Sequence, residues 1–179
     1  MRDRRFVAVH RGGPLDVARH RLLAAWAADC AEHVLPLFEE SSSDDRPRRA
    51  VETARAWARS EVSVGDARKA AVGAHAAARD ATTKSAIAAA RAAGHAVATA
   101  HMSDHCLGPA IYALNALEAT GASIDGERAW QLKQLPDAVR ELVISALHDR
   151  VGERGKKRGE GCHPGFPSFT KSCRPVERQ

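Results

Sequence analysis

Aromatic side chains are scarce in this sequence of 179 residues, where they make up only 4% of the chain. The hydrophobic core must therefore be built mainly from alanine, leucine and valine. There is no run of about 18 apolar residues, which argues against a membrane-spanning helix. The basic N-terminus has no apolar segment behind it, so it lacks the pattern of a secretory signal. These absences favour a cytoplasmic protein of about one domain, with no membrane partner.

The motifs of common enzymes are also missing. The four cysteines contain no CxxC pair, and the chain has neither a GxSxG nucleophile elbow nor a GxxxxGK[ST] phosphate loop. No two acidic residues have a spacing that suggests acid–base chemistry. We therefore expect no enzyme, no cofactor and no bound metal.

Positive charge is present in excess, but it is concentrated at the two ends. The formal net charge is +5, of which residues 150–179 contribute +5 and residues 1–14 contribute +3. The body between them carries −3. A basic chain often binds nucleic acid, but here only the ends are basic, so a nucleic-acid partner is not the leading expectation.

Alanine dominates the middle of the chain, with 21 alanines among the 51 residues from Ala50 to Ala100. Alanine is the best helix former, and its small side chain lets helix axes approach closely. The sequence therefore predicts an all-α fold, a compact bundle of six to seven short Ala-rich helices. A flexible N-terminal arm (1–14), a helical domain (15–151) and a disordered basic C-terminal tail (152–179) are the expected parts.

Helical spacing and turn residues place the individual helices. The expected ranges are 15–38, shortened or kinked at Pro36, then 45–60, 65–81, 84–102, 109–120, 126–135 and 137–151. In the first of these helices, Asp29 and His33 are four residues apart and are expected to pair.

Histidines are the most conspicuous polar residues in the alanine-rich region. His101 and His105 have the HxxxH spacing of metalloprotease helices, but Met102 stands where the catalytic glutamate would be. A metal-dependent helical enzyme is thus the least favoured hypothesis. The preferred interpretation is a polar cluster that ties helices together, formed by His75, Arg91, His95, His101 and His105.

Arginines form a second group of candidates. Residues 68, 72, 75 and 79 follow a 4-3-4 spacing, which places them on one stripe of a helix. Arg68 and Arg79 could line a polar cleft, or they could be solvated charges paired with Glu61 or Asp80.

Four blocks of sequence, taken together, resemble a known family. They are CAEHVLPLFE, DDRPRRAVETARAWA, the run from HAAARDA to AAARAAGHAVATAHMSDHCLGPAIYALNAL, and ERAWQLKQLPDAVRELVISAL. In this order they are similar to the bacterial Imm-five-like immunity proteins of polymorphic toxin systems, over residues 23–149. The positions that match the family are Asp44, Arg46, Pro47, Trp57, His75, Arg79, His95, His105, Tyr112, Trp130 and Leu135.

The resemblance implies an all-α, non-catalytic protein that binds and neutralises a cognate toxin. Arginine and aromatic side chains anchor most protein interfaces, so the candidate partner-binding residues are Arg46, Arg49, Arg79 and Trp130, of which Trp130 could equally belong to the core. The alternative function is a helical nucleic-acid-binding or regulatory binding module. The sequence does not determine the oligomeric state.

Overall fold

The computed structural model describes the backbone of residues 3–158 and the side chains of residues 3–150. Over these residues the chain is all-α and contains no β-strand, which confirms the predicted fold class. The helices are α1 (Val17–Val34), α2 (Pro36–Glu39), α3 (Arg46–Ala58), α4 (Val64–Asp80), α5 (Lys84–Ala98), α6 (Leu107–Glu118), α7 (Asp125–Gln134) and α8 (Asp137–Arg158), with the 3-10 turns η1 (Arg4–Phe6), η2 (Val9–Arg11) and η3 (Ser103–Cys106).

Short polar side chains cap the start of three of these helices. The carboxylate of Asp16 accepts a hydrogen bond from the backbone N–H of Arg19 at the start of α1. Ser63 and Asp66 form a reciprocal capping box at the start of α4, and Thr83 caps α5. Each cap satisfies a backbone N–H that has no partner within the helix.

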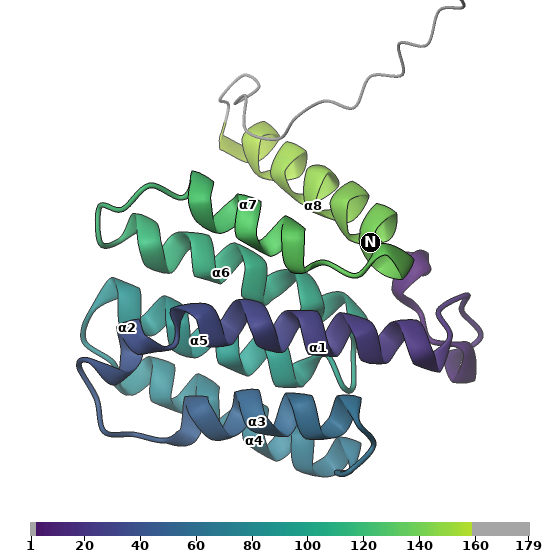
Figure 1. The fold of residues 1–179 in the computed structure, drawn as a ribbon, viewed down its shortest axis with the longest axis horizontal. Coiled ribbons are helices and arrows are strands. Elements are labelled where there is room, and N and C mark those ends of the chain that lie inside the picture. The colour runs from purple at the N-terminus through teal and green to yellow at the C-terminus, as the bar shows by residue number, and fades with distance from the viewer. Residues whose placement is uncertain (1–2, 159–179) are drawn as a thin grey trace, which may run out of the picture. The chain divides into compact units, whose positions relative to one another are not determined.

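Helix α5 lies at the centre and packs against α1, α3, α4 and α6. In Figure 1, α3 and α4 lie on one side of the α1 and α5 pair, and α6 and α7 lie on the other. Most of α5 is buried, as its small side chains allow, and the stripe of Lys84, Ile87, Arg91 and His95 remains exposed or partly exposed. The alanine-rich stretch is therefore the core of the fold.

Pro36 shortens the first helix as expected, because it has no backbone N–H, and it separates α1 from the single turn of α2. The fourth expected helix ends earlier than its expected range of 84–102. Helix α5 ends at Ala98, and the chain then turns through η3 before α6 begins at Leu107. His101 and His105 therefore lie in the connection between α5 and α6 and not on one continuous helix.

The N-terminal segment is packed against the body. Phe6 is completely buried, and the hydroxyl of Ser103 donates a hydrogen bond to the carbonyl of Phe6. Ala8 and Leu15 form an isolated β-bridge that folds the segment back on itself. Gly13 permits this fold, because a Cβ there would lie 1.9 Å from the carbonyl oxygen of Val7. This differs from the expected flexible arm, and the reason is the burial of one aromatic ring.

The chain divides into two structural units, Met1–Val143 and Ile144–Gln179. The second unit contains the later part of α8, whose backbone continues to Arg158. The expected boundary between Val151 and Gly152 thus falls within a helix, since α8 continues through Gly152 and Gly155 at a cost of about 1 kcal/mol each. Residues 159–179 of the expected tail lie outside the described residues. No helix in the described part of the chain is long and apolar enough to cross a membrane.

Candidate functional site

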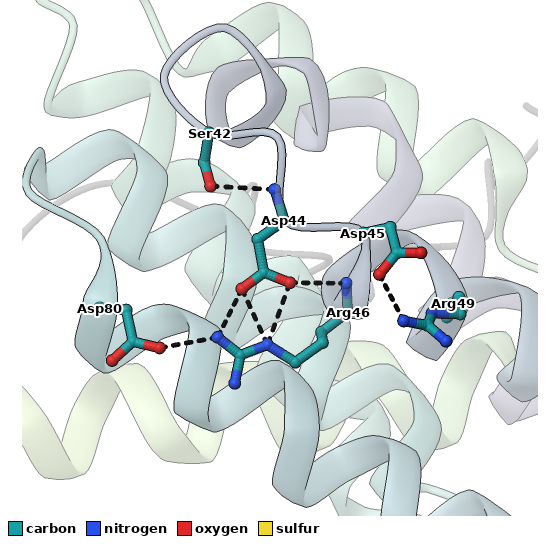
Figure 2. A network of polar contacts seen from close by, with 6 residues as sticks. All are labelled: Ser42, Asp44, Asp45, Arg46, Arg49 and Asp80. Atoms are coloured by element: carbon teal, nitrogen blue, oxygen red, sulfur yellow. Dashed lines mark hydrogen bonds and ion pairs between the residues drawn. The ribbon is translucent and has the colours of Figure 1, made fainter.

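Arg46 links the start of α3 to the end of α4 (Figure 2). Its guanidinium donates to both carboxylate oxygens of Asp44, and its Nη2 donates to Oδ2 of Asp80 at 2.7 Å. Asp44 in turn accepts the backbone N–H of Arg46 at 2.9 Å, and its own N–H donates to the hydroxyl of Ser42. These hydrogen bonds raise the pKa of Arg46 and lower the pKa of Asp44. Arg46 is thus held by two carboxylates of its own chain.

Arg49 is also paired within the chain. Its Nη2 lies 2.5 Å from Oδ1 of Asp45, one helical turn earlier, and both side chains are largely exposed (Figure 2). An exposed pair of this kind contributes little to stability. Arg46 and Arg49 therefore lie together at the start of α3, and both already have an acidic partner.

Arg79 and Arg91 differ from these two arginines. Both are exposed, and no acidic side chain among the described residues pairs with either of them. The two acids considered from the sequence have other partners, since Asp80 binds Arg46 and Glu61 binds Arg59.

His75 lies between these two arginines. Burial lowers the pKa of its imidazole, and the positive charges of Arg91 and Arg79 lower it further. Val72, one turn before His75 on α4, is 68% exposed, and Arg68 lies another turn back. We call the surface formed by Arg68, Val72, His75, Arg79 and Arg91 the α4–α5 basic face.

The predicted histidine cluster is a row that passes from α4 through α5 into the turn η3. The ring centroids of His75 and His95 are 5.2 Å apart, those of His95 and His105 are 5.2 Å apart, and those of His105 and His101 are 5.4 Å apart. Nδ1 of His95 lies 3.3 Å from Nδ1 of His105, so one nitrogen donates and the other accepts. Tyr112 of α6 stacks on His95 from the other side.

Two glycines make room for this row. A Cβ on Gly94 would lie 2.7 Å from Cε1 of His75, and a Cβ on Gly108 would lie 2.7 Å from Cγ of His95. The imidazoles therefore fill space that any larger residue would occupy. Within residues 3–150, no group of three or more histidine, cysteine or acidic side chains is arranged to hold a metal ion.

Trp130 lies on a different surface, formed by α7 and α1. Its ring stacks on His33 with the centroids 3.9 Å apart. His33 is hydrogen-bonded through Nδ1 to Oε2 of the buried Glu127 at 2.5 Å, so it does not pair with Asp29 as expected. Figure 1 shows α7 and α4 on opposite sides of α5, so Trp130 is not part of the α4–α5 basic face.

The sequence did not predict the acidic partners of Arg55 and His33. Asp29 and Glu32 both bind Arg55 of α3, at 2.7 and 2.6 Å. Glu127 binds His33 across 94 positions of sequence. Helical periodicity identifies the buried face of each helix but not the helix that will pack against it, so these pairs left no signal in the sequence.

The described residues thus form an all-α protein in which most arginines pair with an acid of the same chain, whereas those of the α4–α5 basic face do not. A family model described as "Imm-5 like putative immunity protein" matches residues 13–138, and the chain belongs to this family. This confirms the resemblance drawn from the sequence. No match was found among curated proteins or among solved structures.

Proposed function

We propose that this chain is a bacterial, cytoplasmic immunity protein that binds a cognate toxin and neutralises it without catalysis. Membership of the immunity-protein family supports a toxin partner in general. The structural observation that carries the proposal is the α4–α5 basic face. It presents Arg79 and Arg91, both exposed, without an internal counter-charge.

The α4–α5 basic face has the chemistry of an interface anchor. Arginines are over-represented among the residues that dominate binding energy. Val72 adds apolar area that the toxin could cover, and the half-buried His75 is held in place by Gly94 and His95. The complementary surface on the toxin is acidic, because opposite potentials speed association and select the partner.

The other predicted contact residues, Arg46, Arg49 and Trp130, lie outside the α4–α5 basic face. Arg46 and Arg49 lie near Arg79, since Arg46 binds Asp80 at the end of α4. They would contact the toxin at the edge of the α4–α5 basic face, where their existing pairs make them weaker anchors. Trp130 would belong to a separate contact surface on α7.

Charge reversal on the α4–α5 basic face tests the proposal. The chain and the toxin encoded beside it are co-expressed, and cell survival and binding affinity are measured. The Arg79→Glu and Arg91→Glu variants should each weaken binding by about 30-fold, equal to roughly 2 kcal/mol. The control is Arg59→Glu, an equally exposed arginine elsewhere on the surface, and it should protect as the wild type does.

Two results would count against the proposal. If a chain that carries both Arg79→Glu and Arg91→Glu protects cells fully, the α4–α5 basic face is not the contact surface. If the wild-type chain gives no protection against the neighbouring toxin and binds DNA with a steep dependence on salt, the nucleic-acid-binding alternative is correct.

A further inference from the structure

A second cluster of basic side chains surrounds a cavity at the N-terminal end of the first unit. The cavity has a volume of about 390 Å³ and lies where the turn η2, the start of α1, the end of α3 and the start of α4 meet. The residues that give it its character are His10, Arg11, His20, Arg21, Trp57 and His101. We call it the N-terminal pocket, and it shares no residue with the α4–α5 basic face.

The charge of the N-terminal pocket is not balanced from within. Its lining includes two guanidinium groups and three imidazoles but no aspartate or glutamate. Arg11 and Arg21 are exposed, and neither pairs with an acid among the described residues. Several other arginines do pair, such as Arg55 with Asp29 and Arg48 with Glu39. An anion in the pocket would supply the missing counter-charge.

His20 lines the pocket and is affected by the same excess of positive charge. Its ring is 6% exposed, and its Nε2 donates to the carbonyl of Thr99 at 2.7 Å, because a carbonyl oxygen only accepts. Burial lowers the pKa of His20, and the positive charges of His10 and Arg11 lower it further. Arg21 and His101 line the same cavity. A bound anion would oppose the effect of these positive charges on His20.

The N-terminal pocket also has an apolar wall. Trp57 lies beside His20 with the ring centroids 4.8 Å apart, and valine side chains complete this side. Cavities of about 300–1,000 Å³ with an apolar lining and a few placed polar groups are typical small-molecule sites. The combination favours a ligand that has both an anionic group and a flat apolar group.

The backbone beside Trp57 shapes the rim of the pocket. Ser60 lines the pocket and has a φ of +69°, and it is the one non-glycine residue with positive φ in the described chain. The N–H groups of Ser60 and Glu61 donate back to the carbonyls of Trp57 and Ala56, which is the common left-handed ending of an α-helix. It ends α3 so that the following residues form the rim of the pocket.

We propose that the N-terminal pocket binds a small organic anion, with its phosphate or carboxylate between Arg11 and Arg21 and its ring against Trp57. The site is independent of toxin binding, so either proposal can fail without the other. Phenyl phosphate, which combines both groups, is the probe that tests it.

Titration calorimetry on the full chain measures the affinity for phenyl phosphate, inorganic phosphate and benzoate. Phenyl phosphate should bind one per chain and should bind at least about tenfold more tightly than inorganic phosphate. Comparison with benzoate determines whether the anionic group is a phosphate or a carboxylate. Arg11→Gln and Arg21→Gln should each weaken binding at least about tenfold, a loss of roughly 1.4 kcal/mol, whereas the surface control Arg59→Gln should have no effect.

A spectroscopic readout separates binding in this pocket from binding elsewhere. Saturation with phenyl phosphate should raise the pKa of His20 in an NMR titration and should shift the indole N–H signal of Trp57. The proposal is wrong if neither phenyl phosphate nor benzoate shows saturable binding, or if both glutamine variants bind as the wild type does. Equal affinity for inorganic phosphate and phenyl phosphate would rule out the contact with Trp57.

Discussion

Glu127 is a buried carboxylate in which each oxygen has a separate partner. Oε2 lies 2.5 Å from Nδ1 of His33, and Oε1 accepts the side-chain amide of Gln131 at 2.7 Å. The side-chain amide of Gln131 also donates to the carbonyl of Ala110, and the backbone carbonyl of Gln131 accepts from the indole of Trp26. Glu127 therefore connects α7 to α1 directly and to α6 through Gln131.

Replacing Glu127 with alanine should lower the free energy of unfolding by about 2–3 kcal/mol, because the amide of Gln131 would lose a buried acceptor. The matched control is His33→Ala, which should cost about 1 kcal/mol, since this ring is already 45% exposed. Urea denaturation of both variants measures the difference. Equal losses would show that Glu127 acts only through His33.

His20 and His75 should make the fold sensitive to acid. Both have a pKa below the ordinary value of about 6.5 in the folded chain, mainly because of burial. Above pH 6.5 both rings are neutral in the folded and unfolded chains, so they contribute no pH dependence. As the pH falls below 6.5, the unfolded chain takes up these protons first, and the free energy of unfolding declines until the lowered pKa values are passed.

Urea midpoints measured between pH 7.5 and pH 5 test this expectation. The wild type should lose stability steadily below pH 6.5, and His75→Gln should lose less over the same range. His10→Gln should also reduce the loss slightly, because it removes one of the positive charges that lower the pKa of His20. A midpoint that stays constant from pH 7.5 to pH 5 would contradict the proposed effect of burial.

At the scale of helices, the close packing of α6 against α5 depends on a glycine. A Cβ on Gly108 of α6 would meet Cγ and Cβ of His95 at 2.7 and 2.8 Å, atoms that cannot move without moving α5. Gly108→Ala should therefore destabilise the chain by about 1–3 kcal/mol. Gly126→Ala, where no atom lies within 4 Å, should instead stabilise α7 by about 0.5–1 kcal/mol. Thermal melts of the two variants should thus move in opposite directions.

The helices themselves could largely be predicted from the sequence, but their partners could not. Alanine content and turn residues such as Pro36, Thr83 and Gly121 mark helices and their ends locally. Asp29 and His33 show the limit, because the sequence predicts a local pair and the structure gives each residue a partner on another helix. The histidines could be predicted as a cluster, although their order in the row depends on how α4, α5 and η3 pack.

At the scale of the first unit, the N-terminal segment is part of the fold because Phe6 is fully buried. The sequence indicated a flexible segment since residues 1–14 show no periodicity, and a single buried ring leaves no periodic signal. Ala8, His10 and Arg11 of this segment also line the N-terminal pocket. Stability and the proposed anion site therefore depend on the same contact.

Phe6→Ala should lower the free energy of unfolding by about 3–5 kcal/mol, the usual cost of removing a buried aromatic side chain. Val9→Ala, at a side chain that is 56% exposed, should change it by less than about 0.5 kcal/mol. Chemical denaturation measures both. A loss below about 1 kcal/mol for Phe6→Ala would show that this segment is flexible in solution, as the sequence indicated.

The alanine-rich core around α5 determines which amino-acid substitutions this chain can accept. Helix α5 places Ala86, Ala89, Ala93 and Ala96 at full burial, so substitutions there fail by overfilling the space and not by leaving a hole. The arginines and Val72 of the α4–α5 basic face are exposed and take no part in this packing. Under the proposed function, substitutions on the α4–α5 basic face can therefore change which toxin is bound while the packing around α5 stays the same.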